Sequence, residues 1–309
     1  MLKLPSFAKI NWMLRIFGKR PDGYHEVATI LQSISLCDEL TFELRDDSEI
    51  SLTCDDPELP VDDSNLIVKA AKALQKNAGV NITLTKRIPA KGGLGGGSSN
   101  AAVTLLALNH LWELQLENTD LLRFAGTLGA DVPFFLLGGC AEAAGTGTEL
   151  CSVTDVEQKA LIVITPNATV STATAYAALN RGSLTTSKSA SILSSSFARP
   201  FSADSGQWSL HNDFELVIFE IEPEIRRAKQ ALLDAGARGA LLAGSGSSVF
   251  GIFDDEAARD RALGQLGREA GWRIYSCRTV SRAEYLQAMG PSGFPLLRSL
   301  KNRQSDTGA

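Results

Sequence analysis

A glycine-rich stretch with two adjacent serines is the first feature of this sequence that could do chemistry. Residues 88–102 read IPAKGGLGGGSSNAA, with five glycines between a run of strand periodicity and a run of helical periodicity. Glycine reaches positive φ and lets a ligand approach the backbone, and a helix start offers unpaired N–H groups with partial positive charge. The order strand, glycine loop, helix therefore predicts a phosphate-binding site, where the serine hydroxyls can add hydrogen bonds or hold a phosphate-bound metal ion.

The common phosphate-binding motifs do not fit this stretch. Gly92 and Gly97 have the Walker A spacing, but Ser98 occupies the position that this motif gives to lysine. The dinucleotide-binding pattern fails because Gly93 and Gly95 are followed at the third position by Ser98, and no acidic residue ends the following strand. Protein-kinase signatures are absent. A flexible turn that needs glycine only for its shape is the minority interpretation.

Three further places carry residues of possible chemical use. Residues 244–248, GSGSS, join two short apolar runs and predict a second backbone-rich loop, although taken alone a hairpin turn explains them as well. Asp131 lies between a helix end and a proline, where a turn or capping role is the alternative. Lys9 belongs to a strand of alternating apolar residues. Facing inward it would need an anionic partner, and a lysine on the solvated face is an equal alternative.

Composition narrows the class of partner. The chain has 309 residues, 44% of them hydrophobic, and a net charge of -5, which gives no electrostatic footprint for nucleic acid or an anionic membrane. No apolar run reaches the roughly 18 residues of a membrane span, and the N-terminus lacks the pattern of a secretory signal. The five cysteines are scattered without C-x-x-C spacing, so we expect neither disulfides nor structural zinc. A cytoplasmic protein with a small-molecule partner is expected.

The order of the elements predicts an α+β fold in two domains. Several strands precede the first helix, which favours α+β over a doubly wound parallel sheet. We expect domains at 1–155 and 156–289, a tail at 290–309, and a loop or linker at 182–206 that is rich in Ser, Thr and Ala. Strands are predicted at 7–16, 28–36, 40–44, 49–54, 80–88, 159–166 and 272–280, and helices at 63–79 (with Gly79 as the stop), from 98, and at 118–129, 171–180, 223–237 and 255–271.

Taken together, these features resemble the GHMP superfamily of small-molecule kinases, which includes galactokinase, homoserine kinase, mevalonate kinase and phosphomevalonate kinase. Its members share a lysine or related residue in the first strand, a loop P-x-x-x-G-L-G-x-x-S-S and a late G-S-G-S-S loop, all present here in that order. The segment A-K-I-N, followed by G-K-R-P-D-G-Y-H and an apolar strand ending in D-x-L, is similar to the branch that acts on a cytidine-diphosphate-linked methylerythritol. Two places depart from the pattern of this family. Lys91 stands where a small residue is common, and residues 138–150 match the corresponding stretch only loosely.

The resemblance implies both a fold and a reaction. It implies a ribosomal-S5-domain-2-like N-terminal domain that binds ATP, a ferredoxin-like C-terminal substrate domain, and an active site in the cleft between them. ATP, as its Mg²⁺ complex, would phosphorylate the 2-hydroxyl of the cytidine-diphosphate-linked methylerythritol in the non-mevalonate isoprenoid route. Neither nucleic acid nor membrane would take part.

The resemblance also implies roles for single residues. Asp131 would be the general base and Lys9 the cation that keeps it ionised. No acidic metal ligand is assigned, although Ser98 or Ser99 could contact the metal ion. Asn65 would either lie near the adenine or cap a helix. His110 and His211 are expected on a helix surface and at a helix start. The ATP-binding residues would be Pro89, Ala90, Lys91, Gly92, Gly93, Leu94, Gly95, Gly96, Gly97, Ser98 and Ser99, and the substrate-binding residues Asn11, Tyr24, His25 and Tyr176, the last with a core position as the favoured alternative.

Other functions remain open at this stage. A different kinase of the superfamily would differ only in its acceptor pocket. A decarboxylase relative is disfavoured because no acidic-substrate pocket is evident. A nucleotide-binding regulator without catalysis is disfavoured by the presence of both Lys9 and Asp131.

Overall fold

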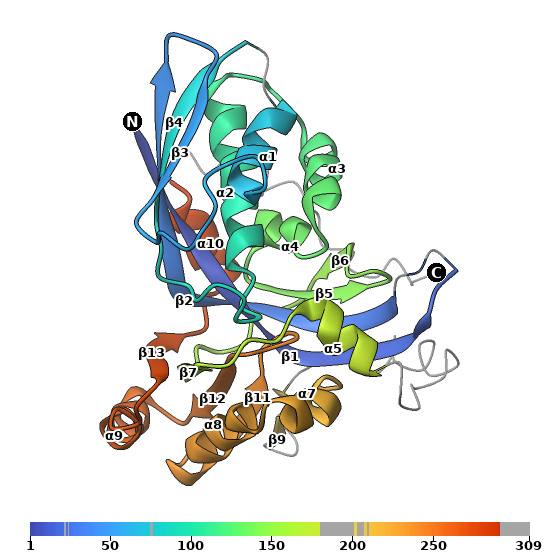
Figure 1. The fold of residues 1–309 in the computed structure, drawn as a ribbon, viewed down its shortest axis with the longest axis vertical. Coiled ribbons are helices and arrows are strands. Elements are labelled where there is room, and N and C mark those ends of the chain that lie inside the picture. The colour runs from blue at the N-terminus through green and yellow to red at the C-terminus, as the bar shows by residue number, and fades with distance from the viewer. Residues whose placement is uncertain are drawn as a thin grey trace, which may run out of the picture.

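The computed structural model describes residues 1–21, 23, 25–74, 77–179, 201–202, 207–208 and 210–290 (Figure 1). Tyr24, most of the expected linker at 182–206, and residues 291–309 of the expected tail lie outside the described residues. Consecutive strands at the start and helices grouped beside them confirm the α+β class. Within the described ranges, no helix combines the length and the apolar character needed to cross a bilayer.

A mixed sheet is built around two long antiparallel strands. Its strand order is β10-β1-β2-β4-β3, with β5 paired to β2 and β6 to β5. The β1–β2 register shifts between Asn11 and Met13. This irregularity lets Leu14 line the same cavity as Lys9, although an odd separation along a regular strand would place the two on opposite faces. The strands are β1 (Leu2–Lys19), β2 (His25–Arg45), β3 (Ile50–Cys54), β4 (Gly79–Thr85), β5 (Cys140–Ala144), β6 (Glu149–Ser152) and β10 (His211–Asn212).

Helices cover one face of this sheet (Figure 1). Helix α2 is buried on most of its surface because α1, α3 and α4 surround it and β1 and β2 lie beneath it. Its Ala- and Leu-rich sequence suits that position, since small and straight-chain residues favour helix and pack closely. The helices are α1 (Leu66–Leu74), α2 (Gly96–Leu111), α3 (Asn118–Leu128) and α4 (Val132–Leu137).

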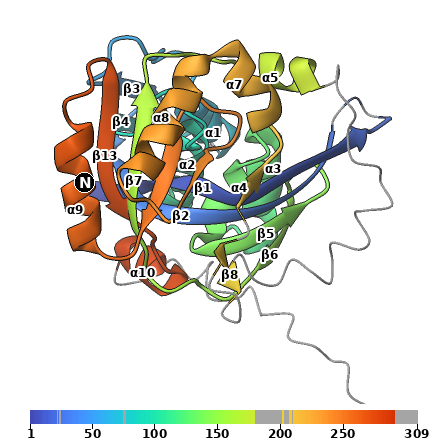
Figure 2. The same cartoon turned by 90° about the horizontal axis from the view of Figure 1, so that it is seen from below.

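A second, antiparallel sheet has the strand order β11-β12-β7-β13. The mixed sheet with helices α1 to α4 is called the first unit below, and this second sheet with its helices the second unit. Every residue of strand β7 is buried, because α8 and α9 pack against the second sheet and the first unit lies beyond it (Figure 2). The elements are β7 (Ala160–Pro166), α5 (Thr172–Leu179), α7 (Glu215–Ile221), α8 (Pro223–Asp234), β11 (Gly239–Leu242), β12 (Val249–Phe253), α9 (Glu256–Leu266) and β13 (Trp272–Arg278), with a separate hairpin of β8 (Phe201–Ser202) and β9 (Gln207–Trp208).

Helix α10 (Arg282–Ala288) follows the second sheet in sequence but packs into the core of the first unit. Tyr285 is fully buried there, and its hydroxyl donates to the carbonyl of Phe135 at 2.6 Å. Its ring centroid lies 5.3 Å from that of Phe7 on β1. The first core therefore contains residues from both ends of the described chain.

Several predicted elements need correction. The strands predicted at 28–36 and 40–44 are one continuous strand, β2. The first helix ends at Leu74, and Gly79 opens β4 where a Cβ would clash with the carbonyls of Asp47 and Glu49. His110 lies exposed on α2 as expected, but His211 lies in β10 and not at a helix start, and its Nε2 pairs with the Asp213 carboxylate at 2.6 Å.

Candidate active site

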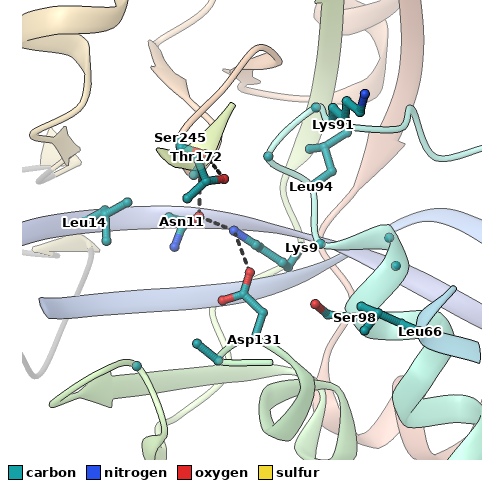
Figure 3. Close-up of a pocket in the computed structure, with 18 of the residues that line it drawn as sticks. Lys9, Asn11, Leu14, Leu66, Lys91, Leu94, Ser98, Asp131, Thr172 and Ser245 are labelled. Atoms are coloured by element: carbon teal, nitrogen blue, oxygen red, sulfur yellow. Dashed lines mark hydrogen bonds and ion pairs between the residues drawn. The ribbon is translucent and has the colours of Figure 1, made fainter. Parts of the chain in front are cut away.

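A cavity of about 1040 Å³ lies where the two units meet. Its walls come from β1, the loop before α2, the start of α4, the start of α5 and the loop after β11, so distant parts of the sequence converge on it (Figure 3). Lys9, Asp131 and residues 89–98 all line this cavity. Residues 89–99 are called the glycine loop and residues 244–248 the GSGSS loop below.

Lys9 faces inward, which decides between the two alternatives left by its strand. It is 3% exposed, and its Nζ donates to Asn11 Oδ1 at 2.8 Å and lies 3.6 Å from Asp131 Oδ2 (Figure 3). The Asp131 side chain is 42% exposed at the start of α4, and it makes no capping hydrogen bond there. An ammonium that is almost fully buried thus stands beside a carboxylate that is open to the cavity.

Asn11 organises the surroundings of Lys9. Its Oδ1 accepts both from Lys9 Nζ and, at 3.2 Å, from the backbone N–H of Gly244. Its Nδ2 donates to Thr29 Oγ1 at 2.8 Å, and Thr29 in turn donates to the Met13 carbonyl at 2.6 Å. Asn11 therefore connects the lysine, the GSGSS loop and the irregular part of β1, while still lining the cavity.

The glycine loop ends in a helix start that is open to an anion. Gly95 is the N-cap of α2 with φ 72°, no side chain caps the helix, and the first turn contains no acidic residue. The first N–H groups of a helix have no intrahelical acceptor, and they carry the positive end of the helix dipole. A Cβ at Gly95 would lie 2.8 Å from the Phe135 ring and 3.0 Å from Lys9 Cγ, so only glycine fits between them.

The GSGSS loop packs directly against the glycine loop. Ser248 donates its backbone N–H to the Gly92 carbonyl at 3.1 Å, and its Oγ lies 2.8 Å from Thr165 Oγ1 on β7. Asn212 holds the GSGSS loop from the other side, because its Nδ2 donates to the carbonyls of Leu242 and Gly244 at 2.8 Å each. The two loops predicted separately from the sequence are thus one packed unit.

Substituting Gly93 should separate these loops. Gly93 has φ +75°, and a Cβ there would collide with the Ala243 carbonyl. If the loop binds ATP, as the resemblance implies, Gly93→Ala should weaken that binding at least about tenfold. It should also lower the melting temperature, because both left-handed backbone strain and the clash oppose the native contact. Gly264→Ala on α9, where a Cβ meets nothing within 4 Å, is the matched control. Wild-type ATP affinity for Gly93→Ala in a binding titration would contradict this contact's importance.

Aromatic side chains line the opposite end of the cavity. The His25 and Tyr176 rings stack with centroids 4.8 Å apart, and Tyr176 meets Phe214 edge-on at 5.0 Å. Burial, with a contribution from the negative charge of Asp131, raises the pKa of the Tyr176 phenol to about 12. Tyr176 therefore stays neutral at ordinary pH and is both packed against a core residue and exposed to the cavity. Tyr24 lies outside the described residues.

The two serines after the glycines have different surroundings. Ser98 lines the cavity, whereas Ser99 is fully buried and its Oγ accepts from Ser6 Oγ at 2.7 Å. Asn65 caps α1, since its Oδ1 accepts from the Ile67 N–H at 2.9 Å, and it also lines the cavity. Both alternatives considered for Asn65 are compatible with this position.

Sequence reasoning missed some residues at this site. Thr172, at the start of α5, is one of them: its hydroxyl lies 3.0 Å from that of Ser245 in the GSGSS loop, and both residues line the cavity beyond Asn11 (Figure 3). Thr29 and Asn212 were missed as well. No local signal marks these residues, because single polar residues in a strand or at a helix start are common and only the tertiary fold brings them together.

Known proteins resemble this chain over nearly its whole length. Residues 65–139 match the GHMP kinases N terminal domain and residues 200–271 match the GHMP kinases C terminal family. The 4-diphosphocytidyl-2-C-methyl-D-erythritol kinase of Syntrophus aciditrophicus is 42% identical over 284 residues, which cover 91% of this chain and 100% of the relative. The chain belongs to the 4-diphosphocytidyl-2-C-methyl-D-erythritol kinase family of GHMP kinases.

Two further comparisons agree with this family. The enzyme of the same name from Pseudomonas savastanoi pv. phaseolicola is 44% identical over 269 residues, covering 86% of this chain and 88% of the relative. A crystal structure of a 4-(cytidine 5'-diphospho)-2C-methyl-D-erythritol kinase has a TM-score of 0.73 at 33% identity, covering 90% of this chain and 99% of that one. A homoserine kinase from Cytophaga hutchinsonii, at 21% identity and TM-score 0.64, covering 90% of this chain and 95% of its own, shares the fold.

Membership in the 4-diphosphocytidyl-2-C-methyl-D-erythritol kinase family makes the chain a small-molecule kinase and implies the use of ATP. The regulator without catalysis is thereby set aside. The glycine loop and Asp131 both fall inside the residues that match the GHMP kinases N terminal domain, and the GSGSS loop falls inside the C terminal match. The motifs that carried the resemblance are those that the fold brings to the cavity.

Proposed function

We propose that this chain transfers the γ-phosphoryl group of ATP to the 2-hydroxyl of 4-diphosphocytidyl-2-C-methyl-D-erythritol. The observation that carries the proposal is the position of the Lys9–Asp131 pair, in the same cavity as an uncapped helix start that follows a glycine loop. Phosphoryl transfer needs an acceptor of the hydroxyl proton within reach of an anchored triphosphate, with charge stabilisation at both places.

The glycine loop would hold the ATP phosphates. Backbone N–H groups at the start of α2 supply donors for the phosphate oxygens, and the glycines let the phosphates approach the chain. The exposed Lys91 lines the same cavity from a left-handed backbone position, with φ 56°, and adds a positive charge near its opening. The adenine would lie toward Asn65 and Leu66, at the start of α1.

Mg²⁺ would enter as the ATP complex. The described residues contain no group of three or more His, Cys, Asp or Glu side chains that could hold a metal ion by themselves. This fits an ion that keeps several waters and is bound mainly through substrate phosphates. Ser98 lines the cavity and is the residue that would hold it. Bound Mg²⁺ neutralises phosphate charge.

Asp131 would take the proton of the attacking hydroxyl. Its carboxylate is a weak base for an alcohol, so positioning supplies much of its effect. The Lys9 ammonium, 3.6 Å from the Asp131 carboxylate, would stabilise the substrate oxygen that becomes negatively charged as the proton leaves. Asn11 keeps the ammonium in place through its hydrogen bond to Nζ.

The cytidine would bind among the aromatic residues at the far end of the cavity. Tyr176 offers a face for stacking, and the imidazole of His25, already stacked on that ring, can contribute hydrogen bonds to the base edge. Tyr24, next to His25 in sequence, is proposed as a further stacking residue from the resemblance alone. Asn11 would reach the polar end of the acceptor.

The domain assignments are proposed on the sheet topology. The order β11-β12-β7-β13, antiparallel throughout and interrupted by helices, supports a ferredoxin-like second domain. The first unit is proposed as S5-like. The boundary between the domains is proposed near residue 155. Helix α10 is assigned to the first domain, because it packs in the core of that domain. The five free cysteines support a cytoplasmic location.

Phosphorus NMR tests the reaction and the acceptor together. Enzyme, ATP and Mg²⁺ are incubated in parallel with the cytidylated methylerythritol, homoserine or mevalonate. We expect a new phosphomonoester resonance and equimolar ADP only with the cytidylated acceptor. A phosphomonoester from homoserine or mevalonate, with none from the cytidylated compound, would replace the proposed acceptor while retaining a kinase of the superfamily.

A further inference from the structure

A buried carboxylate lies behind the glycine loop, outside the cavity. Asp38, in the second half of β2, is 0% exposed. Its Oδ1 accepts from the backbone N–H groups of Arg87 and Ile88 at 2.7 Å each, and both of its oxygens accept from Lys86 Nζ, at 3.0 and 2.8 Å. Its Oδ2 also accepts from Asn100 Nδ2 at 3.1 Å. Donors therefore surround this carboxylate on both oxygens.

Lys86, which directly follows β4, is the cationic partner of Asp38. Its side chain is 8% exposed, and its Nζ donates to the Ile88 carbonyl in addition to the two carboxylate oxygens. These three acceptors match the three donors of an ammonium group. A Cβ built on Gly96 would lie 3.3 Å from Lys86 Nζ, which places the ammonium beside the first turn of α2. Lys86 also lines the cavity, but Asp38 and the Ile88 carbonyl engage the donors of its ammonium, which therefore holds the loop.

The contacts of Asp38 join both ends of the glycine loop. Residues 86–88 lead into the loop, and Asn100 begins the second turn of α2, directly after the loop ends. One carboxylate on the long strand β2 thus fixes the distance between the entry of the loop and the start of α2.

We infer that the Asp38–Lys86 pair is a positioning site that sets the glycine loop for the phosphates of the nucleotide. The inference rests on the proposed binding of ATP at this loop. A buried ion pair adds little net stability compared with apolar residues, yet losing one partner leaves an uncompensated buried charge. The pair therefore makes the loop geometry depend on the presence of both charges.

Asp38→Asn tests the inference because it keeps the shape and changes the hydrogen bonding. The amide oxygen can still accept from the loop N–H groups, but the NH₂ group would face the donors of Lys86 and Asn100. We expect the Kd for ATP to rise at least about tenfold. The affinity for adenosine, which has no phosphates, and the KM for the acceptor should change less than about twofold.

Two further variants separate positioning from folding. Lys86→Met removes the cation while Asp38 keeps its backbone donors, so it should weaken ATP binding at least about threefold and spare adenosine. Asp38→Asn combined with Lys86→Met removes both charges and should recover part of the ATP affinity lost in Asp38→Asn. Asp63→Asn breaks the exposed pair with Lys72 and is the matched control, with wild-type affinities.

Binding titrations with ATP and adenosine, together with KM values for ATP and acceptor, decide the matter. Wild-type ATP affinity in Asp38→Asn with only a lower melting temperature, or an equal loss of ATP and adenosine, would overturn the positioning role. If Asp38→Asn fails to fold, unchanged ATP affinity in Lys86→Met would overturn it. A wild-type protein that binds ATP but does not phosphorylate the cytidylated acceptor contradicts the proposed function alone, because the ATP and adenosine comparison is independent of transfer.

Discussion

Asp131→Asn is expected to lower kcat by about 10²- to 10⁴-fold while ATP binding stays near wild type. The amide of asparagine cannot take the hydroxyl proton, and it carries no charge opposite Lys9. The fold should tolerate the change, because the Asp131 side chain makes no capping hydrogen bond and is 42% exposed. Steady-state kinetics with the cytidylated acceptor and a separate ATP titration measure the two quantities.

Asp120→Asn provides the matched control for that experiment. Asp120 lies in α3, and its carboxylate accepts from the exposed Arg123 at 3.1 Å, away from the cavity lining. Its kcat should equal that of wild type. If Asp131→Asn retained more than about a tenth of wild-type kcat, Asp131 would not be the general base, since such groups contribute far larger factors.

Lys9→Met should lower kcat by about 10²- to 10³-fold. Methionine has a similar length and suits a site where the side chain is 3% exposed, so the main change is the loss of the ammonium beside Asp131. Asn11 keeps a donor in the Gly244 N–H, which preserves the link to the GSGSS loop. Single-turnover measurements at saturating ATP report the transfer step directly.

The double variant distinguishes one catalytic unit from two separate contributions. If Lys9 acts through Asp131, combining Lys9→Met with Asp131→Asn should cost little more than the larger single loss, as residues that act together are not additive. Losses that multiply in the double variant would show independent roles. A weaker ATP affinity of Lys9→Met that accounts for its whole defect would assign Lys9 to binding instead.

The glycine loop was the strongest prediction from the sequence because its chemistry is local. The glycines and the first residues of α2 are adjacent in the sequence. The conformational preferences of glycine are therefore enough to predict a loop before this helix. The pairing of Lys9 with Asp131 could not follow in the same way. It depends on a strand and a helix start separated by more than a hundred residues, and the sequence left the facing of Lys9 open.

The positions that sequence reasoning misjudged have tertiary causes. Alternation in β1 cannot reveal the register shift after Asn11, which changes the side on which later residues lie. Gly79 has the residue type of a helix stop, but a close approach of the backbone at Asp47 and Glu49 is what requires it. Asp38 was seen only as part of a strand-ending motif, and its burial emerges once the loop and α2 fold over it.

The return of α10 to the first core has a consequence for biosynthesis. As the chain leaves the ribosome, the residues around Phe7 and Phe135 emerge long before Tyr285, which they need to complete their packing. Until α10 has been synthesised, the nascent amino-terminal part of the chain exposes an apolar gap that Tyr285 later fills. The first core can therefore be completed only after the second sheet, which precedes α10 in the sequence, has also been synthesised.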